Sequence, residues 1–152
     1  MMRVMVVEDE EMIRKGIVMA VDWAALDCIV VGEAANGEQA LAVAEDCQPT
    51  LIITDLKMPK MDGLEMVRRL REAGSRAYVI ILTAYDSFAY AQTAIRLGAV
   101  DFLLKPFHDG DLENAVLALQ KRIAAQTAPQ PEPLPGVRPG PKSRYVREAM
   151  VY

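Results

Sequence analysis

Five short apolar runs alternate, within residues 1–125, with segments whose apolar positions repeat at helical spacing. Each run is rich in Val, Ile and Leu and shows little alternation, as is typical of strands that are buried on both faces of a sheet. The runs occupy residues 4–7, 29–31, 51–53, 78–82 and 100–104. Because repeated strand–helix units form parallel sheets with right-handed crossovers, the pattern predicts an α/β fold with a doubly wound, five-stranded parallel sheet and helices on both faces.

The segments between and after these runs predict five helices. Three of them are expected to begin near Asn36, Asp62 and Asp86. The first and last helices each have an apolar stripe along one face. The stripe of the first helix consists of Met12, Ile13, Gly16, Ile17, Ala20 and Val21. The stripe of the last helix consists of Leu112, Ala115, Val116, Leu119 and Ile123.

Proline content divides the chain into a body and a tail. Six of the nine prolines lie between residues 129 and 141, a density that excludes helix and strand ladder and favours an extended linker. After the linker, Ser143 can cap a helix whose apolar positions repeat to the last residue. We therefore expect a domain at residues 1–125, a Pro-rich linker at 126–142 and the start of a helix at 143–152.

Charge and composition exclude several classes of protein. Residues 1–125 carry 19 acidic and 13 basic side chains, a net charge of −6, which is too acidic for a nucleic-acid-binding domain. No apolar run is long enough to cross a bilayer and no export signal is visible, so we expect a cytoplasmic location and no membrane partner. Cys28 and Cys47 lack metal-ligand spacing and are expected to be free thiols.

Polar residues that can bind a metal or take part in a reaction follow four of the five runs. In a parallel sheet the carboxyl ends of the strands share one edge, where ligands bind. Carboxylates crowded there repel one another unless a cation offsets them, and their oxygens suit Mg²⁺. An ionised aspartate can attack phosphorus, while a hydroxyl and a lysine neutralise the transferring oxygens. The residues after these four runs are Glu8, Asp9, Glu10 and Glu11, then Thr54 and Asp55, then Thr83, then Lys105. Together they predict that the protein accepts a phosphoryl group. Glu10 and Glu11 are an exception, because their negative charges are more simply explained by the N-terminus of a helix.

The motifs V-V-E-D-E, I-I-T-D-L-K-M-P-K-M-D-G, L-T-A and D-F-L-L-K-P, in this order, resemble the receiver domains of two-component response regulators. The resemblance covers residues 2–124 and implies a flavodoxin-like fold with Asp55 as the phosphoacceptor. It also implies that Mg²⁺ is held by Asp9, Asp55, the backbone carbonyl of Lys57 and, through a water, Glu8. Glu8 departs from the aspartate often found at that position.

The same resemblance implies how the signal is read. Thr83 and Lys105 would contact the phosphoryl group, and the conformational switch would involve Thr83 and Phe102. Because Phe102 lacks the hydroxyl of a tyrosine, switching at this position must depend on packing.

The resemblance also implies partners. A sensor histidine kinase would supply the phosphoryl group. The sequence leaves the oligomeric state open, and the surface around residues 85–95 and Phe102 is the candidate for a homodimer contact. The stretches at residues 21–41 and 82–107 are similar to receivers that are joined to AraC-type DNA-binding domains. We therefore expect control of transcription, with DNA bound only through an effector domain that this chain does not contain.

Two other classes share parts of the set. Hydrolases of the haloacid-dehalogenase type also combine a strand-end aspartate, a Thr, a Lys and Mg²⁺, but they carry a second acid two residues after the nucleophile, where this chain has Lys57. A flavodoxin-like cofactor carrier needs a phosphate-binding loop after the first strand, where this chain has acidic residues that would repel a phosphate. The pattern favours a regulatory phosphoacceptor that catalyses only its own phosphoryl transfer and dephosphorylation.

Overall fold

The computed structural model describes residues 1–83, 88–96, 98–99, 101–104 and 110–127. Their strands form one parallel sheet in the order β2-β1-β3-β4-β5. The strands are β1 (Met2–Val7), β2 (Cys28–Ala34), β3 (Leu51–Asp55), β4 (Tyr78–Thr83) and β5 (Asp101–Leu104). The predicted doubly wound sheet is therefore confirmed.

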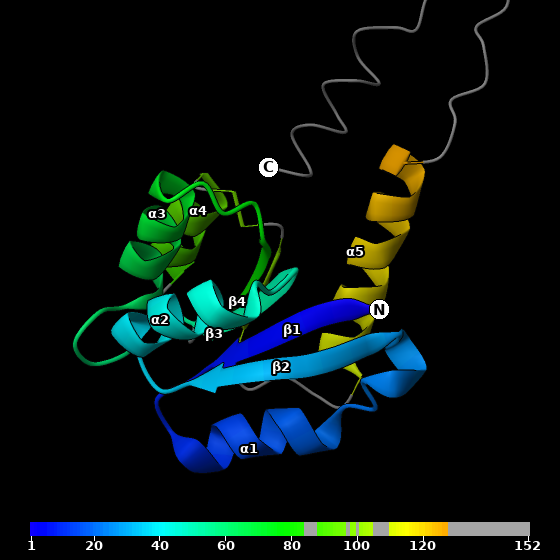
Figure 1. The fold of residues 1–152 in the computed structure, drawn as a ribbon, viewed down its shortest axis with the longest axis horizontal. Helices are drawn as coiled ribbons and strands as arrows, with labels where there is room; N and C mark the ends of the chain where they lie inside the picture. Colours follow the sequence, from blue (N-terminus) through cyan, green and yellow to red (C-terminus); the bar gives the residue numbers. More distant parts are fainter. Residues whose placement is uncertain (84–87, 97, 100, 105–109, 128–152) are drawn as a thin grey trace, which may run out of the picture.

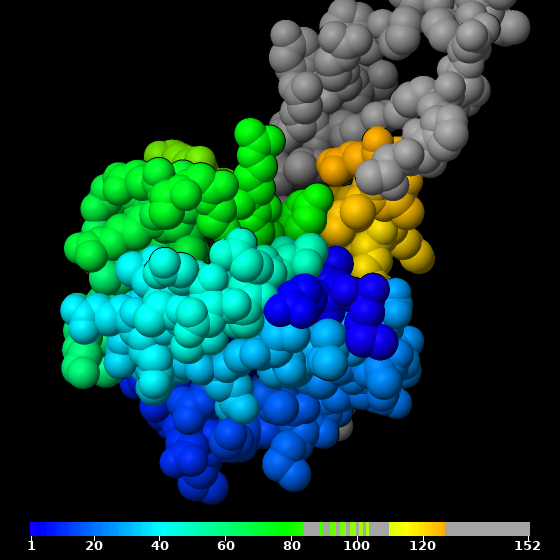
Figure 2. All heavy atoms as spheres, in the orientation of Figure 1, coloured from blue at the N-terminus to red at the C-terminus, as the bar shows by residue number. Residues whose placement is uncertain are grey.

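Within the described residues, five α-helices cover the two faces of the sheet. They are α1 (Glu11–Ala20), α2 (Gly37–Cys47), α3 (Gly63–Glu72), α4 (Phe88–Arg96) and α5 (Asp111–Thr127), and a short 3₁₀ helix spans Ala24–Leu26. Figure 1 shows α2, α3 and α4 on one side of the sheet and α1 on the other. Helix α5 shares a buried cluster with α1, so it covers the same face as α1. Helices α2 and α3 lie side by side and form a continuous surface in the space-filling view (Figure 2).

Burial of both faces explains why the strands read as continuous apolar runs. Met5 and Ile52 pack under α2 and α3, whereas Val4 and Ile53 pack under α1 and α5. All four side chains are fully buried. A strand with one wet face would alternate apolar and polar residues.

Two helix starts lie where the sequence predicts them. The Asn36 side chain accepts a hydrogen bond from the backbone N–H of Gln39 (2.9 Å), and Asp62 accepts one from that of Glu65 (2.8 Å). Each satisfies an amide that the first turn of a helix leaves without an intrahelical partner. The third expected start, Asp86, lies outside the described residues.

The apolar stripe predicted for α1 is only partly correct. Ile17 and Val21 are buried, but Met12 is 87% exposed, and Gly16 and Ala20 are exposed as well. The reason is that only the second half of α1 packs against the sheet, together with Trp23, whose indole N–H donates to the carbonyl of Val18 (3.0 Å). The stripe of α5 is confirmed, with four members buried and Ile123 partly buried.

Both cysteines are free, as expected. Cys28 is buried, and this burial, together with the nearby Asp27, raises the pKa of its thiol. In the part of the chain that the structure describes, no helix combines the length and the hydropathy that crossing a bilayer requires.

Candidate functional site

Three carboxylates from two distant segments meet at the carboxyl edge of the sheet. Glu8 and Asp9 follow β1, and Asp55 ends β3. One carboxylate oxygen of each lies within 4.8 Å of the other two. The strand order reverses at β1, which has β2 on one side and β3 on the other, so the cluster sits where doubly wound sheets bind ligands.

The three carboxylates differ in exposure. Glu8 is 1% exposed, Asp55 is partly buried and Asp9 is exposed. The cluster is thus open to solvent on the side of Asp9. Carboxylates held this close, one of them buried, are costly to keep ionised unless a cation or hydrogen bonds offset their charge.

The donor set fits a small divalent cation. Two oxygens bound to one Mg²⁺ at about 2.1 Å lie at most about 4.2 Å apart. A cluster whose oxygens lie within 4.8 Å of one another therefore needs to contract by only roughly half an ångström. The exposed side leaves room for the waters that Mg²⁺ usually keeps.

Hydrogen bonds hold Asp55 in one orientation. The backbone N–H of Leu56 donates to Oδ1 of Asp55 (2.7 Å). The hydroxyl of Thr54, which is fully buried, donates to the backbone carbonyl of Asp55 (2.8 Å). A carboxylate fixed in this way loses little side-chain entropy when it reacts or binds a metal.

The loop after Asp55 approaches it closely at Gly63. The N–H of Gly63 donates to the carbonyl of Leu56 (2.7 Å). A Cβ at Gly63 would lie 2.2 Å from the carbonyl oxygen of Asp55, closer than any side chain allows. The motif residues Asp62 and Gly63 therefore have structural roles: Asp62 caps α3, and Gly63 lets α3 begin directly against the end of β3. The sequence predicts the helix start near Asp62, but it does not predict the close approach of Gly63 to Asp55.

Of the remaining predicted site residues, the structure describes Thr83 and Lys57 fully and only the backbone of Phe102. Thr83 is fully buried at the end of β4, one residue beyond Leu82, which pairs with Asp55. Lys57 is exposed in the loop between β3 and α3. The backbone of Phe102 pairs with Ile81, but its side chain lies outside the described residues, as does all of Lys105.

One contact near the cluster could not be predicted from sequence pattern. Arg14 of α1 donates from Nη1 to the backbone carbonyl of Glu8 (2.8 Å), and it also pairs with Glu33 of β2. Helical spacing places Arg14 among the polar positions of α1, and nothing in that spacing indicates which backbone atom it reaches.

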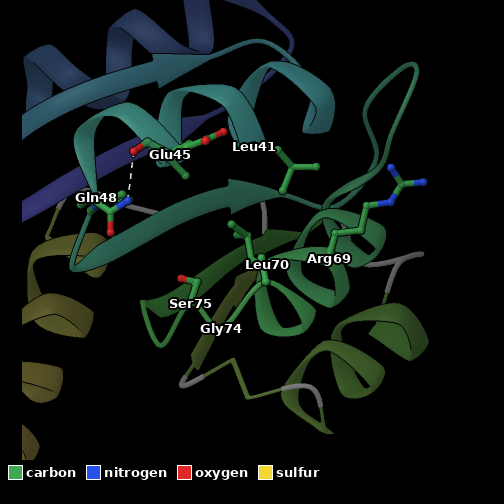
Figure 3. A pocket seen from close by; sticks show the side chains of 10 residues that line it. Leu41, Glu45, Gln48, Arg69, Leu70, Gly74 and Ser75 are labelled. Atoms are coloured by element: carbon green, nitrogen blue, oxygen red, sulfur yellow. Dashed lines mark hydrogen bonds between the residues drawn. The ribbon is translucent and has the colours of Figure 1, made fainter.

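A hollow of about 540 Å³ lies elsewhere, between the C-terminal ends of α2 and α3 (Figure 3). Leu41 and Leu70 contribute to its apolar wall, and Gln48 on its rim donates to the carbonyl of Glu45 (3.0 Å). Among the residues that the structure describes, no predicted site residue lines it. A smaller hollow of about 180 Å³ adjoins the site loop and is lined by Leu56, Lys57, Asp62 and Leu64.

Known proteins resemble this chain in sequence and in fold. A family model described as the response regulator receiver domain matches residues 4–117. The uncharacterized transcriptional regulatory protein YesN of Bacillus subtilis is 32% identical over 124 residues, which cover 82% of this chain and 33% of YesN. The match spans between a third and a half of the length of YesN and of two further curated relatives, both named as response regulatory proteins.

Two solved structures extend the comparison. The REC domain of AraT, a response regulator from Geobacillus stearothermophilus, has a TM-score of 0.77 and 37% identity, and the match covers 84% of this chain and 98% of that one. A two component transcriptional regulator AraC from Clostridium phytofermentans has a TM-score of 0.74 and 27% identity, and the match covers 84% of this chain and 100% of that one.

Proposed function

Because this chain belongs to the family of response regulator receiver domains, we propose that it accepts a phosphoryl group on Asp55 and thereby controls an output domain. The observation that carries the proposal is the carboxylate cluster at the switch point of the sheet, in which hydrogen bonds orient Asp55. The family match supports the reaction class, and the cluster supports the choice of residue.

In the proposed reaction, a carboxylate oxygen of Asp55 forms a bond to phosphorus. The bond between phosphorus and the donor's nitrogen or oxygen breaks, and the donor atom keeps its electron pair. Glu8, Asp9, Asp55 and the backbone carbonyl of Lys57 would hold Mg²⁺, with Glu8 acting through a water, and the ion would neutralise the charge on the phosphoryl oxygens. Thr83 and Lys105 would donate hydrogen bonds to the same oxygens.

Phosphorylation can act as a signal only if its contacts differ between two conformations of the protein. Thr83 is the proposed reader of the phosphoryl group, because it is buried at the end of the strand beside Asp55. Phe102, the second residue of β5, is the proposed packing element that responds, because its backbone pairs with Ile81 of β4, the strand that ends in Thr83. No enzymatic turnover of an external substrate is proposed.

The proposed partners follow from the family and from the relatives' names. A sensor histidine kinase would donate the phosphoryl group in the cytoplasm. The relatives named as transcriptional regulators, including an AraC protein of similar fold, support an output in transcription, with DNA bound through a domain outside these 152 residues.

Labelling with a small phosphodonor tests the proposal. Acetyl phosphate and Mg²⁺ should label the wild-type protein once, and Asp55→Asn should abolish the label because it removes the nucleophile. Asp62→Asn is the matched control: it makes the same change in the same loop, and asparagine caps a helix as well as aspartate does. Undiminished labelling of Asp55→Asn, or rapid repeated turnover of acetyl phosphate, would contradict the proposal.

A further inference from the structure

Arg14 joins three parts of the molecule around the carboxylate cluster. It lies on α1, with only 13% of its side chain exposed. Its Nη1 donates to the backbone carbonyl of Glu8 (2.8 Å), and its Nε donates to Oε1 of Glu33 on β2 (3.2 Å). We propose that Arg14 is a positioning residue that holds the turn between β1 and α1 in the geometry that brings Glu8 and Asp9 to Asp55, and thereby sets the affinity for the divalent cation.

The first step concerns the backbone at Glu8. Its N–H donates to the carbonyl of Ala34, the last residue of β2 (3.0 Å), so strand-like pairing continues one residue beyond β1. Its carbonyl is directed to Arg14. Both backbone polar groups of Glu8 are thus hydrogen-bonded, the N–H to the sheet and the carbonyl to α1, immediately before the chain turns at Asp9. Because a hydrogen bond from a charged donor is among the stronger kinds, its loss at this buried position frees the turn.

The second step concerns charge. A guanidinium near a cation site would by itself repel the cation, which argues against a favourable role. Here the carboxylate of Glu33 offsets that charge and also binds Nζ of Lys15 (3.1 Å to each oxygen). Side-chain exposure of 13% for Arg14 and 27% for Glu33 keeps this pair out of bulk solvent. Because Arg14 and Lys15 share this one carboxylate, it offsets only part of their positive charge, and the favourable contribution that we propose for Arg14 is geometric.

The positional effect and the charge effect of Arg14 predict opposite changes in the affinity for the cation, which makes the proposal testable. If Arg14 acts by position, its removal weakens cation binding even though a positive charge has been lost. If its charge dominates, its removal strengthens cation binding. The inference rests on the proposed function only for the identity of the cation.

The experiment measures the Kd for Mg²⁺ by calorimetric titration of the unphosphorylated full chain. Arg14→Met, which keeps an apolar stem of similar shape, should raise the Kd about tenfold, the lower end of the effect seen when residues that orient metal ligands are removed. Arg14→Lys, which can keep one hydrogen bond but not both, should give an intermediate Kd. Lys15→Met is the matched control, because Lys15 binds the same Glu33 but forms no hydrogen bond with Glu8 in the described part of the chain, and its Kd should stay close to that of the wild type.

A second readout needs no metal. Hydrogen exchange of the Glu8 and Asp9 amides, measured by NMR without Mg²⁺, should be faster in Arg14→Met than in the wild type and in Lys15→Met. A Kd for Arg14→Met that is unchanged or lower would overturn the inference, and so would equal effects of Arg14→Met and Lys15→Met. If Arg14→Met fails to fold, Arg14→Lys decides, and a wild-type exchange rate in that variant overturns the inference. If Asp9→Asn leaves the Kd unchanged, the proposed metal site fails, while amide exchange still tests the role of Arg14.

Discussion

The two edges of the sheet differ in what they offer a ligand. At the amino edge, between the ends of α2 and α3, lies a hollow of about 540 Å³ whose apolar wall is accompanied by one acidic and one basic side chain, Glu45 and Arg69. At the carboxyl edge, three carboxylates lie within 4.8 Å of one another beside a buried threonine. The amino edge has ample space with balanced charge, whereas the described part of the carboxyl edge concentrates three acidic side chains.

The proposed site is therefore identified by the chemistry of its side chains, since the amino edge offers the larger hollow. Like charges from residues 8, 9 and 55 come together only because the strand order places β1 beside β3. A bound divalent cation would offset the repulsion between these carboxylates, which supports the proposed magnesium site. The following substitutions compare the two edges directly.

The largest effect is expected from the exposed carboxylate of the cluster. Asp9→Asn should weaken Mg²⁺ binding by more than about tenfold and slow phosphorylation, because a site with few charged ligands loses one of them. Glu8→Gln should have a smaller effect, since its contact with the metal is proposed to pass through water. Glu45→Gln, the same change at the amino edge, should leave the affinity unaltered. Calorimetric titration of all three variants checks the order, and a stronger effect of Glu8→Gln would show that the ligand assignment is wrong.

A smaller chemical effect but a large signalling effect is expected at Thr83. Thr83→Ala should still be phosphorylated on Asp55, but the protein should lose most of its conformational response, because the hydroxyl that reads the phosphoryl oxygens is gone. The response can be followed as NMR chemical-shift changes on adding a phosphodonor. Thr50→Ala, an exposed threonine at the amino edge, should respond as the wild type does. A normal response from Thr83→Ala would refute the coupling.

Glycine substitutions separate stability from chemistry. Gly63→Ala should lower the free energy of unfolding by about 1–3 kcal/mol and slow labelling, because the new Cβ would lie 2.2 Å from the carbonyl oxygen of Asp55. Gly74→Ala, on the rim of the hollow, meets no atom within 4 Å but has a φ of +89°, so it should cost about 1 kcal/mol through backbone strain alone. Urea unfolding and acetyl phosphate labelling measure both properties. Equal labelling rates for the two variants would contradict the role given to Gly63.

The smallest effect is expected on the exposed face of α3, away from the cluster. Hydrogen bonds from Arg68 and Arg69 lower the pKa of Glu65 from about 4.5 to about 2. A carboxyl whose pKa is lower in the folded state stabilises the fold above its unfolded pKa and loses that contribution as the pH falls towards the folded value. Glu65→Gln should therefore be slightly less stable than the wild type at neutral pH, and the difference should shrink between about pH 4.5 and 2. Surface ion pairs contribute little, so a large difference at neutral pH would contradict this account.

Much of the fold could be predicted because local pattern and global fold agree. Val4–Val7 and Leu51–Ile53 read as buried strands, and Asn36 and Asp62 as helix caps, from residue type and spacing alone. The meeting of Glu8, Asp9 and Asp55 also followed, since parallel strands share one carboxyl edge. The resemblance to receiver domains is confirmed by the family match.

The parts that could not be predicted depend on tertiary contacts. Met12 has the same apolar character as Ile17, but only Ile17 faces the sheet, because α1 packs through its second half. Arg14 reads as a solvent-facing cation until the fold brings the carbonyl of Glu8 within its reach. Gly63 is part of a sequence motif, and its close approach to Asp55 is visible only in three dimensions.

The most direct test of the central claim is to locate the phosphoryl group itself. The protein is treated with acetyl phosphate and Mg²⁺, the acyl phosphate is trapped by reduction, and the modified residue is identified by peptide mass spectrometry. The account predicts one modification, on Asp55, that does not form when Mg²⁺ is chelated. A modification on any other residue, or one on Asp55 that forms equally well without divalent cation, would contradict it.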